Sequence, residues 1–233
     1  MPVPCGMVIC ALSREAAKVE TTALPFPVFV MGPGEHFAGA FSSHLDSLAA
    51  SGKAAPEWIL LAGYSGSLKP EAKPGDLVFA SHVFQGGVKS AAWLSRPLKM
   101  AQGVPHSHSG AIVTVDRLAY SPQEKRELGA KFNAVAVDME SAHFARLCEQ
   151  QGIRWGVVRS IFDSLDDSLH PSMARWCNSD GSENRRALAW DLALSPGWWW
   201  QLPGWAQRDR LAGEALAQGV AKFIAGQTVE NGT

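Results

Sequence analysis

The stretch AVAVDMESAHFARL, residues 134–147, indicates the fold class more directly than other parts of the sequence. Its first four residues form an apolar run, which is typical of a buried strand. The run stops at Asp138, Met139 and Glu140, and a helical pattern of small and apolar residues follows. A buried strand that ends in carboxylates directly before a helix indicates an α/β protein whose polar site lies at the ends of its strands.

Further apolar runs alternate with helical patterns along the chain. The predicted strands cover residues 7–12, 28–31, 58–62, 76–84, 111–115, 134–137 and 155–161. The predicted helices cover residues 35–51, 122–131, 140–151, 183–194 and 206–225. No helix is predicted between 76–84 and 111–115, so we expect a mixed sheet. The expected fold class is α/β: a three-layer sandwich with a central mixed sheet, formed as a single domain over residues 1–233.

Length and composition limit the classes of function. The chain has 233 residues, of which 46% are hydrophobic and 18% charged, with a formal net charge of −1. This composition indicates a globular protein and gives no support for nucleic acid as a partner. The four cysteines form no C-x-x-C pair, so we expect no disulfide framework, no metal and no cofactor. Neither a leader segment nor an apolar run of about 18 residues is recognisable, and a cytoplasmic location is expected.

Three carboxylates follow predicted strands, at the edge of the sheet where α/β proteins bind ligands. Glu140 either interacts with the N-terminus of the next helix or accepts hydrogen bonds from the vicinal hydroxyls of a sugar. Asp163, at the end of VVRSIFD, either caps the next segment or acts as a general acid. Glu15 is either an acid of a helix start or a base that activates water. Asp138 is expected to be a cap or to support the residues that contact the ligand.

Two stretches of small residues complete the candidate site. MGPGEHFAG, residues 31–39, places Gly32 and Gly34 before a helix, where backbone N–H groups can bind an anion. It matches neither G-x-G-x-x-G nor a Walker A motif. AGYSGSL, residues 62–68, is predicted to leave the strand as a loop over 63–67. That loop either lets the backbone approach a substrate closely or is an ordinary turn.

Taken in order, these segments resemble the nucleoside phosphorylase and nucleosidase superfamily, the family of purine nucleoside phosphorylase and methylthioadenosine/S-adenosylhomocysteine nucleosidase. The similar segments are VICALSREAAKV, MGPGEHFAGA, ILLAGYSGSLKPEAKPGDLVFAS, AVAVDMESAHFA and VVRSIFD, within about residues 7–164. The resemblance implies an enzyme, a purine nucleosidase or nucleoside phosphorylase, that releases adenine by attack of water or phosphate. It also implies a homo-oligomer. TVDRLAYSPQEKREL followed by VAVDMES resembles the hopanoid-associated phosphorylase branch, which implies a lipid-linked adenosyl substrate, adenosylhopane.

The resemblance also implies a role for individual residues. Asp163 and Glu15 would be the catalytic pair, with Asp163 assisting departure of the purine and Glu15 activating water. The implied substrate-binding residues are Met139, Glu140, Leu118, Phe162, Gly63, Tyr64 and Ser65. The implied anion or water site is formed by Gly32, Gly34 and Ser65.

Several residues depart from the family pattern. Leu118 stands where nucleosidases have an aromatic residue, Phe162 replaces a serine and Tyr64 replaces a small residue. No arginine is expected beside the 63–67 loop, which favours water over phosphate unless Arg117 or another distant arginine reaches the site. These departures leave open a non-catalytic nucleoside-binding protein of the same fold. A flavodoxin-like or dinucleotide-binding protein is a third alternative, and the missing glycine motif argues against the latter.

The C-terminal third contains a tryptophan-rich segment, LSPGWWWQLPGW, residues 194–205. It is predicted to be a buried strap that packs the last helix on the sheet. The alternative is an interfacial patch in which Trp198, Trp199 and Trp200 contact a membrane surface. The preceding segment, 165–185, is predicted to be a loop or lid with His170 at the surface.

Overall fold

The computed structural model describes residues 6–52, 55–86, 92–94 and 104–229. Its strands are β1 (Gly6–Cys10), β2 (Val28–Val30), β3 (Trp58–Ser67), β4 (Leu77–Gln85), β5 (Ala92–Leu94), β6 (Ser107–Thr114), β7 (Ala134–Asp138) and β8 (Arg154–Asp163). Its helices are α1 (Ser13–Glu20), α2 (Glu35–Ala50), α3 (Pro122–Phe132), α4 (Ser141–Gln151), α5 (Arg185–Leu194) and α6 (Leu202–Val229). Two short 3-10 helices, η1 (Pro171–Trp176) and η2 (Pro196–Gln201), flank α5.

The strands form one mixed eight-stranded sheet in the order β2-β1-β3-β7-β6-β4-β5, with β8 paired to both β3 and β4. Long β3 makes this topology possible. Its first residues pair in parallel with β1, whereas Gly66 and Ser67 pair antiparallel with β7. Since β8 connects β3 to β4, the strands β3, β7, β6, β4 and β8 form a closed ring. The predicted mixed sheet is confirmed.

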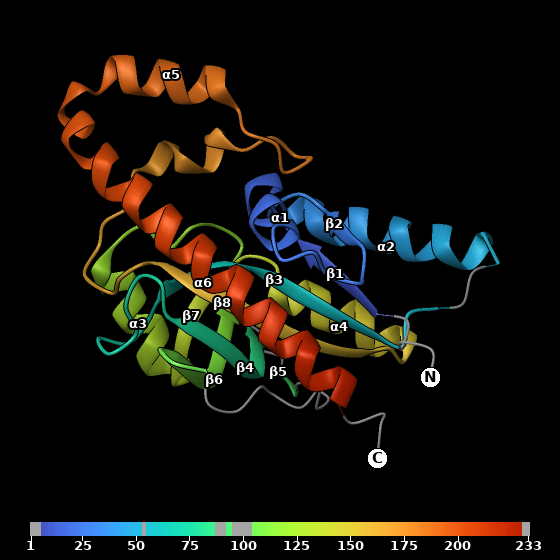
Figure 1. Cartoon of the computed structure of the whole chain (residues 1–233). Coiled ribbons are helices and arrows are strands. Elements are labelled where there is room, and N and C mark those ends of the chain that lie inside the picture. Colours follow the sequence, from blue (N-terminus) through green and yellow to red (C-terminus); the bar gives the residue numbers. More distant parts are fainter. Residues whose placement is uncertain (1–5, 53–54, 87–91, 95–103, 230–233) are drawn as a thin grey trace.

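Helices cover both faces of this sheet, as the three-layer prediction requires. One hydrophobic core includes Phe37 and Phe41 of α2 and Phe144 of α4, all fully buried. A second contains Val19 of α1 and Leu216 of α6, and a smaller third one includes Val113 of β6 and Ala134 of β7. Figure 1 shows α6 running the length of the molecule across its face of the sheet.

Three local predictions were wrong at the ends of strands. Residues 13–15 are not a loop but the first turn of α1, where the Glu15 carboxylate accepts the Leu12 N–H at 2.9 Å. Residues 63–67 are not a loop either, since they continue β3: residues 63–66 pair with β8, and Ser67 pairs with β7. Likewise, β8 extends through Phe162 to Asp163.

The segment after β8 leaves the sheet and forms a cap of η1, α5 and η2. Figure 1 shows α5 set apart from the sheet, and its closest packing is with η1 and η2. The buried-strap prediction is wrong for Trp199 and Trp200, which are 56% and 90% exposed. The Trp199 indole N–H donates to the Leu192 carbonyl of α5 at 2.8 Å. The side chain of Trp198 lies outside the described residues.

The exposed tryptophans belong to a larger group on the cap, which we call the tryptophan patch: Trp190, Leu194, Trp199 and Trp200. Trp190 and Leu194 are each 66% exposed. None of the helices in the described part of the chain is long and apolar enough to cross a membrane.

Candidate active site

A cavity of about 390 Å³ opens where β1, β3, β7 and β8 end. It is large enough for a small molecule such as a nucleoside. Most of the residues that the sequence singled out line it: Glu15, Gly34, Tyr64, Ser65, Leu118, Met139, Glu140, Phe162 and Asp163. A narrow extension borders Asp163 and Leu118 together with Asp138 and Met139. Glu15 lies beside Gly63 and Asp163 beside Gly66, three residues further along β3, so these two carboxylates lie at different ends of one cavity.

Glu15 is fixed by backbone donors on both of its carboxylate oxygens. Oε2 accepts the Leu12 N–H at 2.9 Å, and Oε1 accepts the Tyr64 N–H from β3 at 2.8 Å. The side chain is buried, and this burial raises the pKa of Glu15, while Arg159 opposes the rise. A carboxylate held in this way has a fixed direction and a higher proton affinity than one in water.

Glu140 connects the end of β7 to the start of α2. Its Oε1 accepts the Gly34 N–H at 2.9 Å. Gly34 has φ +60°, and an added Cβ would lie 3.0 Å from Met139 Cε, so glycine is needed for this approach. Burial raises the pKa of Glu140 to about 7, even though Arg159 lowers it. The Gly34 N–H is occupied by Glu140, which weakens the prediction of an anion site there.

Two predicted site residues do not line the cavity. Gly32 packs against the backbone of the cap, where an added Cβ would lie 1.9 Å from the Ser179 carbonyl oxygen. Gly63 lies beneath the cavity floor, where an added Cβ would lie 2.3 Å from Arg159 Nη1 and 3.0 Å from Glu15 Oε1. Both glycines therefore serve close packing around the site.

Arg159 was missed by the sequence interpretation, which expected no arginine beside residues 63–67. It pairs with Gly63 across β3 and β8, and its side chain is fully buried. Nη2 lies 2.8 Å from Asp138 and 3.3 Å from Glu140. Nε and Nη1 have no hydrogen-bond partner within the described part of the chain. Asp138 also accepts from the Ser141 N–H at 3.3 Å, which agrees with its predicted capping role.

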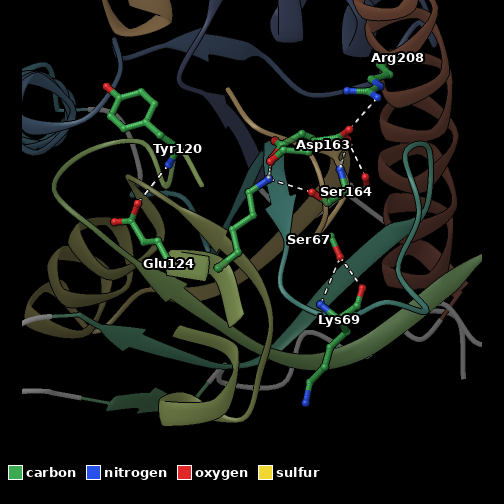
Figure 2. Close-up of polar contacts among 9 residues, drawn as sticks. Ser67, Lys69, Tyr120, Glu124, Asp163, Ser164 and Arg208 are labelled. Carbon is green, nitrogen blue, oxygen red and sulfur yellow. Dashed lines mark hydrogen bonds and ion pairs between the residues drawn. The ribbon is translucent and has the colours of Figure 1, made fainter. Parts of the chain in front are cut away.

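Asp163 forms an ion pair with a different buried cation, Lys125 of α3. The Lys125 ammonium group bonds Asp163 Oδ2 and donates to the carbonyls of Ser164 and Asp167 at 2.8 and 2.9 Å. Burial raises the pKa of Asp163, and Lys125 is the largest influence that lowers it. Figure 2 shows Asp163 beside Ser164, with Arg208 of α6 on the far side of the turn.

Two departures from the family pattern contact each other. The rings of Tyr64 and Phe162 stack with their centroids 5.9 Å apart and an angle of 21° between their planes. The Arg14 guanidinium lies 5.5 and 5.8 Å from the two ring centroids. Arg14 is the only Lys or Arg among the described residues that line the cavity. Arg117 does not reach it, because its side chain is 64% exposed and pairs with Glu124 at 2.8 Å.

The cap closes one side of the cavity. Its contributing residues, which the sequence identified only as part of a lid, are Met173, Ala174, Cys177, Asn178 and Ser179. His170 is not among them, and its Nδ1 accepts the Ser172 N–H at the start of η1. No group of three or more His, Cys, Asp or Glu side chains within the described residues has the arrangement of a metal site.

The fold and the site define an α/β protein with a carboxylate-lined pocket for a small molecule. The sequence model of the Phosphorylase superfamily matches residues 26–192, and the chain belongs to this family.

Two relatives are nucleosidases. The aminodeoxyfutalosine nucleosidase of Helicobacter pylori is 29% identical over 152 residues, which cover 56% of this chain and 65% of that protein. The 5′-methylthioadenosine/S-adenosylhomocysteine nucleosidase of Exiguobacterium sp. is 27% identical over 140 residues, 50% of this chain and 60% of that protein. The matched region thus spans less than two thirds of either relative.

Solved structures match over nearly the whole chain. The 5′-methylthioadenosine/S-adenosylhomocysteine nucleosidase of Neisseria meningitidis, in complex with methylthio-immucillin-A, has a TM-score of 0.67 at 18% identity. That match covers 94% of this chain and 97% of the other. The nucleosidase of Colwellia psychrerythraea, in complex with adenine, has a TM-score of 0.66 at 16% identity, with 95% and 94% covered. These similarities confirm the predicted fold.

Proposed function

We propose that this protein is an N-glycosidase that cleaves a purine nucleoside and releases adenine, with water as the nucleophile. The observation that carries the proposal is one cavity with Glu15 and Glu140 at one end and Asp163 at the other. Cleavage of such a bond places positive charge on the ribose and negative charge on the departing base. Two acidic positions in different environments suit these two demands.

The two ends of the cavity differ in net charge, as stabilisation of a positive ribose and a negative base requires. Around Arg159 lie three carboxylates, those of Asp138, Glu140 and Glu15. When these acids are ionised, one cation for three carboxylates leaves this end negative, which stabilises positive charge on a ribose. Asp163 instead has Lys125 as its own counterion. In the proposal Glu140 accepts hydrogen bonds from ribose hydroxyls, while Met139 and Leu118 line the sugar and the base.

Water suits the sugar end better than phosphate does. A phosphate placed there faces Glu15 and Glu140, and Arg159 lies beneath the floor and does not line the cavity. In the proposed step, the oxygen of water bonds to C1′ and its proton passes to Glu15. The bond from C1′ to the base breaks, and Asp163 supplies the proton or hydrogen bond that the base requires. Ser65 also lines the cavity, and its Oγ has no hydrogen-bond partner among the described residues.

The experiment is release of adenine from adenosine, methylthioadenosine, S-adenosylhomocysteine and an adenosyl lipid, with and without phosphate. Release independent of phosphate supports the nucleosidase, whereas a strict requirement for phosphate replaces it with a phosphorylase. Glu15→Gln and Asp163→Asn are each expected to lower kcat about 100- to 10,000-fold. Asp166→Asn, at a position 75% exposed, is the matched control and leaves kcat unchanged. Nucleoside binding without release of base favours the non-catalytic alternative.

A lipid-linked adenosyl substrate such as adenosylhopane is the finer form of the proposal. Its support is the tryptophan patch, because tryptophan prefers the boundary between water and lipid. Arg185 and Arg186 are exposed at the start of α5 and suit anionic headgroups. Co-sedimentation with anionic vesicles is expected for the wild type and is lost in Trp190→Ser/Trp200→Ser, but not in the neighbouring control Gln201→Ser. Absence of wild-type binding removes the membrane contact.

A homo-oligomer is also part of the proposal, and light scattering of the purified chain tests it. If the double tryptophan variant becomes monomeric, the patch is an interface between copies of the chain. If the oligomer persists and vesicle binding is lost, the patch contacts lipid.

A further inference from the structure

Lys125 approaches Asp163 from outside the cavity. Its side chain is fully buried, and it does not line either the cavity or its extension. The three acceptors of its ammonium group, Asp163 Oδ2 and the carbonyls of Ser164 and Asp167, match the three hydrogens that a lysine can donate. Lys125 therefore has no donor left for a substrate, and any effect on a reaction passes through Asp163.

The start of α3 fixes the position of this lysine. Ser121 caps the helix by accepting the Glu124 N–H at 3.2 Å, and Pro122 occupies its first turn. The Tyr120 N–H donates to Glu124 Oε2 at 3.1 Å, a contact drawn in Figure 2. These bonds fix the first turn of α3, and the Leu169 N–H, which donates to the Tyr120 carbonyl at 2.9 Å, connects it to the segment that follows β8. The ammonium group is thus held by the backbone on both sides.

The Asp163 carboxylate is confined from the opposite side by β3. An added Cβ on Gly66 would lie 3.1 and 3.3 Å from its two oxygens. Oδ2 is engaged by Lys125, whereas the structure gives Oδ1 no bond to Lys125. One oxygen is anchored, and the carboxyl group still borders the cavity and its extension. The pair presents Asp163 to a ligand in one orientation.

We infer that Lys125 is a positioning residue of the proposed glycosidase, which anchors Asp163 through Oδ2 and sets the pH at which this carboxyl group exchanges its proton. The inference rests on the proposed function for its catalytic consequence. Its geometric part, the control of Asp163 by Lys125, is independent of that function. Three charged groups face Asp163: Lys125 from α3, Asp167 from the turn after β8 and Arg208 from α6.

Among these groups Lys125 has the dominant effect. Arg208 acts mainly on Asp167, which it contacts at 2.9 Å, and Asp167 in turn accepts the Ser164 N–H at 2.7 Å. Burial raises the pKa of Asp163, and Lys125 limits that rise. Removing the lysine charge leaves burial unopposed, so the pKa of Asp163 increases further. Asp163 then exchanges its proton at a higher pH, whichever protonation state the reaction uses.

The test measures Asp163 directly, by ¹³C NMR of its carboxyl carbon across a pH titration, with Asp163→Asn to assign the signal. In Lys125→Met the midpoint is expected about one pH unit or more above the wild type. The limb of the kcat/KM profile for adenine release that reports Asp163 is expected to move by the same amount. Lys125→Gln, which keeps a donor without the charge, replaces Lys125→Met if thermal unfolding shows that the methionine variant does not fold.

Arg126→Met is the matched control. Arg126 is the next residue of α3 and pairs with Asp166 of the same turn, but it is 56% exposed. Its removal is expected to leave the Asp163 midpoint unchanged. An unchanged midpoint in the folded Lys125 variant, or equal shifts in both variants, overturns the inference. A wild type that releases no adenine overturns the proposed function alone, because the NMR midpoints still decide the role of Lys125.

Discussion

Two buried cations lie behind the cavity, and they differ in how completely they are satisfied. Arg159 is shared by Asp138, Glu140 and Glu15, yet two of its nitrogens have no hydrogen-bond partner among the described residues. Within the described part of the chain, Lys125 forms an ion pair only with Asp163, and its other two ammonium hydrogens are donated to backbone carbonyls. One end of the cavity is therefore short of positive charge, while the other is neutralised. The Arg159 end can therefore stabilise a cationic sugar, whereas Asp163 at the Lys125 end can exchange a proton with a base.

The largest effect on stability is expected from removing Arg159, the cation that lies among three carboxylates. Arg159→Met leaves Asp138 and Glu140 buried without their counterion, so the free energy of unfolding at pH 7 is expected to fall by about 3–5 kcal/mol. The control is Arg154→Met on the same strand, where a half-exposed arginine pairs with Glu57 at 3.5 Å. That change is expected to cost less than about 1 kcal/mol. Urea unfolding of both variants checks this, and similar losses would contradict the special role of Arg159.

The pH dependence of stability reports on the end of the cavity that contains Glu140. The pKa of Glu140 is raised to about 7, above its value in an unfolded chain. The folded state therefore retains a proton that the unfolded state releases, and the free energy of unfolding falls as pH rises from about 4.3 towards 7. Because glutamine does not titrate, the Glu140→Gln variant does not lose stability in this way as the pH rises.

The measurement is urea unfolding of wild type and Glu140→Gln at pH 4.5 and pH 8. The stability of the variant relative to the wild type is expected to increase between these values, by on the order of 2–3 kcal/mol. Glu35→Gln, a nearby residue with an exposed carboxylate, is the control and gives no such increase. A constant difference at both pH values would contradict the rise in the pKa of Glu140 that burial causes.

The sequence predicted the acids of both ends but neither cation, and the reason is physical. Glu15, Glu140 and Asp163 were recognisable because each follows an apolar run, where a buried strand ends. Lys125 lies in PQEKREL beside Arg126, and the two have the same local surroundings in sequence although only Lys125 is buried. Which face of α3 meets the turn after β8 is decided by tertiary packing.

Arg159 did leave a signal in the sequence. It stands within WGVVRSI, a run too apolar for a surface strand, so the strand prediction already implied a buried guanidinium. A buried cation requires carboxylates nearby, and the acids at other strand ends were the available partners. The strand character of residues 63–67 was less accessible. Gly63, Ser65 and Gly66 have low strand propensity, and their pairing with β8, together with that of Gly66 with β7, keeps them extended.

A smaller effect is expected at Gly63, where the backbone makes room for Arg159. Gly63→Ala places a methyl group 2.3 Å from Nη1 and 3.0 Å from Glu15 Oε1, so the guanidinium must shift. We expect a loss of about 1–3 kcal/mol in stability and a lower kcat/KM, measured by urea unfolding and by adenine release. Gly39→Ala in α2, where an added Cβ meets nothing within 4 Å, is the control. It is expected to be neutral or stabilising by up to about 1 kcal/mol.

The smallest effect is expected at the tryptophan patch, which lies on the cap and contacts neither cation site. Trp200 is 90% exposed and Trp190 66% exposed, so Trp190→Ser/Trp200→Ser is expected to change the free energy of unfolding by no more than about 0.5 kcal/mol per site. The kcat/KM for a water-soluble nucleoside is expected to stay as in the wild type, because the chemistry depends on groups beneath the cavity. A large loss on soluble substrates would mean that the cap orders the cavity itself. If kcat/KM falls only for an adenosyl lipid in vesicles, the patch captures the lipid substrate. The chemical step then depends on the carboxylates and on the two buried cations that contact them.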